Sequence, residues 1–64
     1  MEGYTNEELR EALRALESTI SKCENAHVKL REGTSQHTLL TRRIKALRIS
    51  EALIKRELGG IASE

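Results

Sequence analysis

Apolar positions recur along the first half of the chain with alternating gaps of four and three residues. That rhythm is typical of a helix that packs along its whole length against another helix. The positions of this first seam are Leu9, Leu13, Leu16, Ile20, Cys23, His27 and Leu30. A second seam with the same rhythm follows a polar break, and its positions are Leu40, Ile44, Leu47, Glu51, Ile54 and Leu58. The two seams predict an all-α fold, an antiparallel two-helix hairpin.

Capping signals predict where the first helix begins and ends. Thr5 and Glu8 have the spacing of a capping box, so this helix should cover about residues 6–31. A turn is expected at residues 32–35. Within it, Gly33 is the expected residue beyond the helix end, because glycine adopts a left-handed backbone at little cost.

The second helix has a start and a stop signal of its own. Ser35 or Thr34 should cap it, and it is expected over about residues 36–58. The tail, residues 59–64, follows a glycine pair and is expected to fray. Residues 1–64 should therefore form a single helical-hairpin domain.

Folding the chain at the polar break brings both seams into one register. In every facing pair the residue numbers add up to 70 or 71, and the pairs are Leu30–Leu40, His27–Ile44, Cys23–Leu47, Ile20–Glu51, Leu16–Ile54 and Leu13–Leu58. The same register places Glu24 near Arg48 and Glu17 near Lys55. One flank of the hairpin should therefore be closed by opposite charges, which fix the register more than they stabilise it.

The opposite flank, here called the apolar flank, is small and unpaired in this register. Its positions are Ala12, Ala15, Thr19 and Ala26 on the first helix and Leu39, Ala46, Ser50 and Leu53 on the second. Leaving a leucine in water forgoes roughly 1.5–3 kcal/mol, and a lone hairpin has nothing to cover these leucines. We expect this flank to form a homodimer, a four-helix bundle, or to receive a different protein.

The size of the chain also favours association. A chain of 64 residues rarely builds a self-sufficient core without disulfides, a metal or oligomerisation. One cysteine excludes an internal disulfide, and Cys23 with two histidines is too small a set for a closed zinc site in one chain. No cofactor is expected. In length and dimer plan alone the layout resembles the Rop family of RNA-binding regulators, but it shares no motif with them, so no residue role follows.

Charge and hydropathy indicate no membrane partner and a cytoplasmic location. The net charge is +1, no segment is long and apolar enough to span a bilayer, and the beginning of the chain lacks a basic, apolar signal region. A lone cysteine suits a reducing compartment.

A basic stretch of the second helix is the candidate for nucleic-acid contact. Residues 35–58 hold six basic side chains against two acidic ones. Arg42, Lys45 and Arg48 could present cations to phosphates, but no aromatic side chain accompanies them for base stacking. The alternative is an ordinary solvated helix surface with Arg48 paired to Glu24.

Three seam positions have chemical alternatives. Cys23 and His27 have the spacing of two metal ligands on one helix face, although both are more simply explained as seam residues. Glu51 interrupts the second seam, either as a buried carboxylate that specifies register or as an edge residue paired with Arg48 or Lys55. We favour the structural interpretation for each.

The polar turn offers hydroxyls and helix-start amides that could bind an anion, but capping chemistry explains it better. Ser35, His37 and Cys23 form no catalytic triad, because no acid is placed to orient the histidine. No catalytic residue is assigned. The sequence predicts a non-enzymatic interaction or regulatory module that binds protein, with a nucleic-acid-binding regulator as the alternative.

Overall fold

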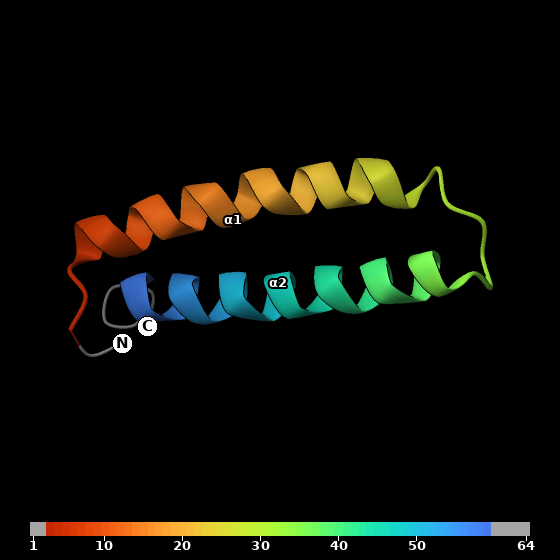
Figure 1. The fold of residues 1–64 in the computed structure, drawn as a ribbon. Helices are drawn as coiled ribbons and strands as arrows, with labels where there is room; N and C mark the ends of the chain where they lie inside the picture. Colours follow the sequence, from red (N-terminus) through yellow and green to blue (C-terminus); the bar gives the residue numbers. More distant parts are fainter. Residues whose placement is uncertain (1–2, 60–64) are drawn as a thin grey trace.

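A computed structural model describes residues 3–59 of the chain. Helix α1 covers Asn6–His27 and helix α2 covers Ser35–Gly59. The two helices run antiparallel, side by side along the long dimension of a molecule that measures 41 × 20 × 19 Å (Figure 1). The predicted all-α antiparallel hairpin is confirmed.

The start of α1 is the predicted capping box. The backbone N–H of Glu8 donates to the Thr5 hydroxyl at 3.0 Å, and the Thr5 N–H donates to the Glu8 carboxylate at 2.9 Å. Both groups would otherwise lack partners at a helix start. Residue 6 is therefore the first helical residue, as the sequence predicted.

The end of α1 differs from the prediction, because the helix stops at His27 and not near residue 31. Beyond it the winding tightens: the Lys29 N–H donates to the Ala26 carbonyl and the Leu30 N–H to the His27 carbonyl, both at 3.1 Å. Bonds that reach back three residues in place of four end an α-helix. Leu30 is still half-buried, so the seam places its side chain correctly although its backbone is not helical.

The connection therefore covers residues 28–34, and the predicted turn at 32–35 is too short. Gly33 has a φ of 91° as expected, but it belongs to the approach to α2 and is not the residue that ends α1. A Cβ there would meet no atom within 4 Å, so the backbone conformation alone favours glycine.

Thr34 caps α2 in preference to Ser35, the other predicted cap. Its hydroxyl accepts from the His37 N–H at 3.2 Å and donates to the Arg31 carbonyl at 2.8 Å. Ser35 is the first residue of the helix, which continues one residue past the predicted end to Gly59. The rest of the tail predicted to fray, residues 60–64, lies outside the described residues.

Every predicted seam position lies on the covered side of the hairpin. Leu9, Ile20 and Ile54 are buried, with 4 to 6% of their surface exposed, and the other seam residues are half-buried. The core is thus a single strip of side chains between two helices. Each apolar side chain of this strip packs against the facing helix alone, because no third helix of the described chain covers the strip.

The predicted charged flank is also confirmed. Arg48 forms an ion pair with Glu24, and the Lys55 Nζ lies 4.0 Å from a carboxylate oxygen of Glu17. Because both pairs are largely exposed, each contributes about 0–1 kcal/mol to stability. They act mainly by setting which residues of the two helices face each other.

Candidate interaction surface

All eight residues of the apolar flank are exposed. Leu39 and Leu53 keep 56% and 50% of their surface in water. The two hydroxyls of the flank are already bonded within their own helices, since Thr19 donates to the Ala15 carbonyl at 2.8 Å and Ser50 donates to the Ala46 carbonyl at 3.0 Å. These hydroxyls therefore do not depend on water for a partner, and covering them costs little.

Ile49 extends this exposed apolar surface, and the sequence analysis missed it. It is 52% exposed and lies two residues from both Leu47 and Glu51. At about 100° per residue, its side chain points about 160° away from the contact with α1. The signal was present, because Ile49 follows Leu39 and Ala46 at helical spacing, but it belongs to neither seam.

The large exposed apolar side chains of the helices all belong to α2. Among the described residues, five large apolar side chains are strongly exposed: Tyr4, Val28, Leu39, Ile49 and Leu53. Tyr4 precedes α1 and Val28 is its C-cap, so the other three alone lie within a helix. The apolar flank is thus unequal: α1 contributes only alanines and a threonine, whereas α2 contributes large side chains.

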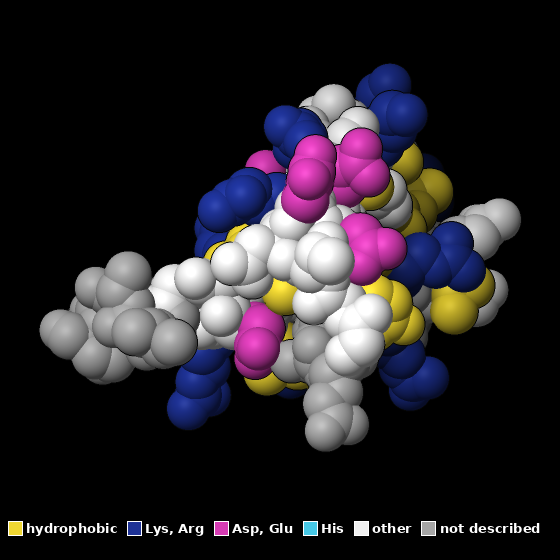
Figure 2. Space-filling view, turned by 90° about the vertical axis from the view of Figure 1, so that its left-hand side faces the viewer, with side chains coloured by type: hydrophobic (Ala, Val, Ile, Leu, Met, Phe, Trp, Pro, Cys, Tyr) yellow, Lys and Arg dark blue, Asp and Glu magenta, His cyan; other side chains and the backbone are white. Residues whose placement is uncertain are grey.

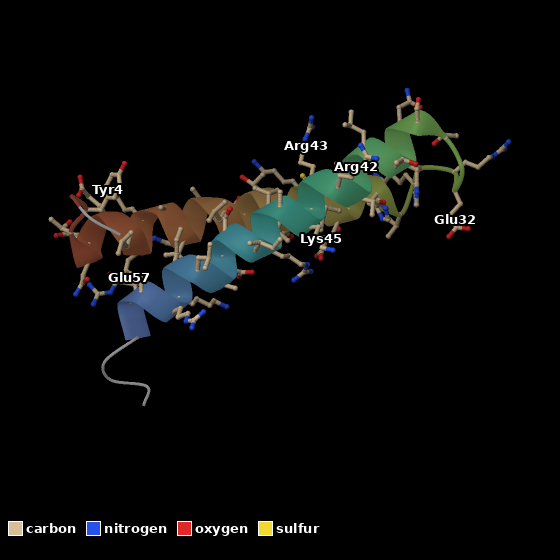
Figure 3. The ribbon with its side chains drawn as sticks, turned by 90° about the horizontal axis from the view of Figure 1, so that it is seen from below. Tyr4, Glu32, Arg42, Arg43, Lys45 and Glu57 are labelled. Atoms are coloured by element: carbon tan, nitrogen blue, oxygen red, sulfur yellow. The ribbon has the colours of Figure 1, made fainter. Side chains whose placement is uncertain are left out.

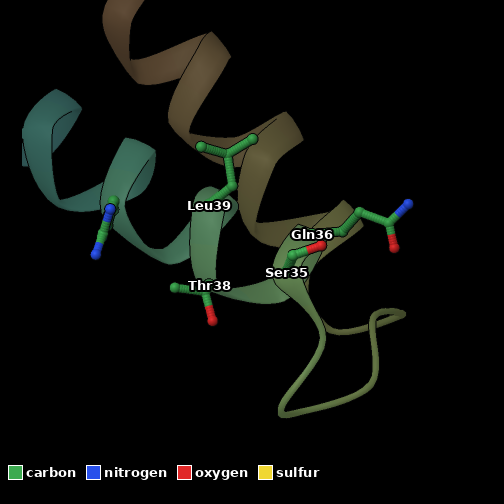
Figure 4. Close-up of a pocket in the computed structure, with 5 residues that line it drawn as sticks. Ser35, Gln36, Thr38 and Leu39 are labelled. Carbon is green, nitrogen blue, oxygen red and sulfur yellow. The ribbon is translucent and has the colours of Figure 1, made fainter.

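Two open hollows each include one residue of the apolar flank, Leu39 in one and Ala12 in the other. One, at the start of α2, is lined by Ser35, Gln36, Thr38, Leu39 and Arg42 (Figure 4). The other, at the opposite end of the hairpin, is lined by Tyr4, Glu8, Leu9, Glu11, Ala12 and Ile54. Both are depressions that a side chain from another helix could fill, and neither is an enclosed substrate cavity.

The two histidines come together where the hairpin turns. The rings of His27 and His37 lie with their centroids 4.2 Å apart, and the His27 Nε2 lies 2.8 Å from the Thr41 hydroxyl oxygen. Cys23, the other half of the candidate metal pair, is a free, half-buried thiol one turn before His27. Within residues 3–59 no group of three or more His, Cys, Asp or Glu side chains could hold a metal ion.

The three candidate phosphate contacts differ in their surroundings. Arg42 and Lys45 are exposed, and Figure 3 shows them with Arg43 along the first half of α2. Arg48 is held in its ion pair with Glu24, as the alternative interpretation expected. Seen from the open end of the hairpin, basic side chains project to several sides of the molecule and do not gather on one face (Figure 2).

The remaining candidates have structural partners. The Glu51 carboxylate lies 3.4 Å from the Lys55 Nζ, so the expected pairing of Glu51 with Lys55 is present. The Thr34 hydroxyl of the polar turn is engaged on both sides by the Arg31 carbonyl and the His37 N–H, which is capping chemistry.

Comparisons of the chain with protein-family models, curated proteins and solved structures found no significant match. Over the part of the chain that the structure describes, neither helix combines the length and apolar character needed to cross a membrane.

Proposed function

We propose that this protein is a small helical interaction module that acts by binding protein, and that its first partner is a second copy of itself. The observation that carries the proposal is the row of half-exposed Leu39, Ile49 and Leu53 on α2. Completing the burial of one such side chain is worth about 1 kcal/mol, half the value for a fully exposed one. Covering this row in both copies of a homodimer would therefore contribute several kcal/mol.

The narrow core supports the same conclusion. Three apolar residues of the described chain are buried, and all of them lie in the single strip between the helices. A hairpin of this size has little stability to spare, so association and folding should be coupled. In a homodimer of four packed helices, the side of α2 that faces away from α1 would also contact apolar side chains, as the side that faces α1 already does.

A second candidate is a regulator that binds nucleic acid through α2. It is favoured by the exposure of Arg42 and Lys45 and by the excess of basic side chains on this helix. It is weakened by the occupation of Arg48 and by the absence of stacking aromatic residues on α2. A phosphate binder would lose affinity steeply as salt is added, which separates the two candidates.

The homodimer is tested by sedimentation equilibrium and by melting over a hundredfold range of concentration. The melting temperature should rise with concentration, and Leu53→Glu should weaken self-association at least about tenfold, because it places a charge in the apolar interface. Ser18→Glu is the matched control, since it adds the same charge at an exposed position of α1 outside the apolar flank. A folded monomer at tens of micromolar, with no dependence on concentration, would refute self-association.

A further inference from the structure

We propose that two copies of the hairpin meet through α2 alone, antiparallel, with Ala46 on the two-fold axis. The inference rests on the proposed function and adds to it which helices touch and in what register. It starts from a row of exposed positions on α2, here called the outer seam: Ser35, Leu39, Arg42, Ala46, Ile49, Leu53 and Arg56. Their gaps alternate between four and three without a break, so they line one face of α2 on its far side from α1, with apolar side chains at four of the seven positions.

The outer seam matches itself when a second copy is reversed. Leu39 then faces Leu53 of the second copy, and Ala46 faces Ala46, with residue numbers that add up to 92. Arg42 faces Ile49, and Ser35 faces Arg56, with totals of 91. In this one register every position of the outer seam faces another position of the outer seam. The two seams within the hairpin face each other in the same way. The smallest apolar side chain of the row falls at the centre, where two helices must approach most closely.

The hollow at the start of α2 fits this register. Three positions of the outer seam, Ser35, Leu39 and Arg42, line this hollow, and Figure 4 shows two of them, Ser35 and Leu39. In the reversed arrangement Leu53 of the second copy comes to lie over Leu39, the apolar residue that lines this open hollow, so two half-exposed leucines meet. Two-fold symmetry repeats this contact at the other end of the interface.

The charges on α2 favour the antiparallel direction. A parallel pair would place Arg42 against Arg42 and Arg56 against Arg56, and like charges in direct opposition repel. In the antiparallel pair Arg42 lies against Ile49 of the second copy, where its aliphatic stem can cover the isoleucine while the guanidinium stays in water.

The size of the exposed side chains favours α2 over α1 as the meeting surface. The exposed apolar positions of α1 in the apolar flank are alanines, which offer little area to a partner. The dimer would therefore arrange its four helices in one layer, in the order α1, α2, α2, α1. This differs from the closed four-helix bundle that would use both helices of the flank equally.

Disulfide trapping tests the register. In a Cys23→Ala background, which removes the native thiol, Ala46→Cys should give a covalent dimer under mild oxidation. Helix axes about 8–10 Å apart, with Cα atoms about 2.3 Å from each axis, leave facing Cα atoms within reach of a disulfide. Leu39→Cys alone should not link to itself, because 14 residues of helix, about 21 Å, would separate the two sulfurs. Mixed with Leu53→Cys, it should link to that variant.

Charge rescue gives an independent measurement on protein without disulfides. Leu39→Glu and Leu53→Lys should each weaken self-association at least about tenfold, and an equimolar mixture should recover most of it. In the mixed dimer the introduced carboxylate faces the introduced ammonium group at one end of the interface, and Leu39 faces Leu53 at the other. Each variant alone has neither of these favourable pairs. Sedimentation of the separate and mixed proteins measures both values.

The outcomes separate this inference from the proposed function. Linkage through Ala46→Cys together with rescue in the mixture supports the antiparallel α2 pair. Linkage of Leu39→Cys to itself, or of the matched α1 variant Ala15→Cys in place of Ala46→Cys, would overturn the register while leaving the homodimer intact. A wild-type protein that stays monomeric would overturn both.

Discussion

The imidazole of His27, the last residue of α1, lies against the imidazole of His37 in the first turn of α2, with an angle of 31° between the rings. The Thr41 hydroxyl donates to the His37 carbonyl at 2.8 Å, so it is free to accept from the His27 Nε2 on its other side. These three residues connect the two helices at the end of the hairpin where the chain turns.

Thr41→Val removes the contact with His27 and the bond to the His37 carbonyl. It should lower the free energy of unfolding by about 0.5–1.5 kcal/mol for each hydrogen bond that contributes. Valine keeps the shape and the branched Cβ, so the change isolates the hydroxyl that His27 contacts. Urea denaturation at one fixed protein concentration measures the effect. Thr38→Val, at an exposed position in the same part of α2, controls for valine itself. Equal stability of the two variants would show that the His27 contact contributes nothing.

The purified protein should hold no stoichiometric zinc, and a chelator should leave its melting temperature unchanged. The His27 Nε2 is already hydrogen-bonded to Thr41, and the thiol of Cys23 is half-buried in the seam. Two ligands per chain would also leave a tetrahedral site incomplete, and in the proposed order α1, α2, α2, α1 the two α1 helices of a dimer do not meet. Elemental analysis decides the matter, and one zinc per dimer would contradict the prediction.

Features that depend on the helical spacing of side chains could be predicted from the sequence, whereas the backbone geometry of the turn could not. The seams, the capping box and the Glu24–Arg48 pair follow from helical spacing, and all are confirmed. The predicted end of α1 was wrong because the seam rhythm continues to Leu30, whereas the backbone winds more tightly after His27. Side-chain rhythm reports which positions face the partner, and it does not report the hydrogen bonds of the backbone that carries them.

The candidate surface was only partly predictable for a related reason. The positions beside the seam of α2 include Leu39 and Leu53 but not Ile49, which lies on the far side of the helix. His37 was likewise missed as a seam residue, although it precedes Leu40 by three residues and is half-buried. Ile49 belongs to a second row of positions with the same alternating gaps, and His37 extends the seam of α2 by one position toward the turn.

Replacing Arg42, Lys45 and Arg48 together with glutamine tests nucleic-acid binding. If α2 binds phosphates, the triple variant should bind every sequence more weakly and should show a flatter dependence on salt, with a slope reduced by up to about one unit for each phosphate no longer neutralised. Because Arg48 is held by Glu24, we expect no more than two of the three to contribute. Unchanged affinity for bulk RNA and DNA in the triple variant would remove this candidate.

Glu51→Leu should stabilise the hairpin, because it restores an apolar residue to the one charged position of the second seam. The Glu51 side chain is only 17% exposed, and the register sets it opposite Ile20, which is itself 5% exposed. Leucine there should add about 1–2 kcal/mol of apolar burial, whereas the ion pair with the exposed Lys55 is worth about 0–1 kcal/mol.

Urea denaturation at a fixed protein concentration measures the gain. Lys55→Gln is the matched control, since it leaves the seam unchanged and removes the ion pairs of Lys55 with Glu51 and Glu17. It should lower stability by no more than about 1 kcal/mol for each pair. A loss of stability in Glu51→Leu would mean that the carboxylate does more than pair at the edge of the seam. In that case Glu51 would be acting to exclude other registers of the two helices, and the variant should show a broader or multiphase unfolding transition.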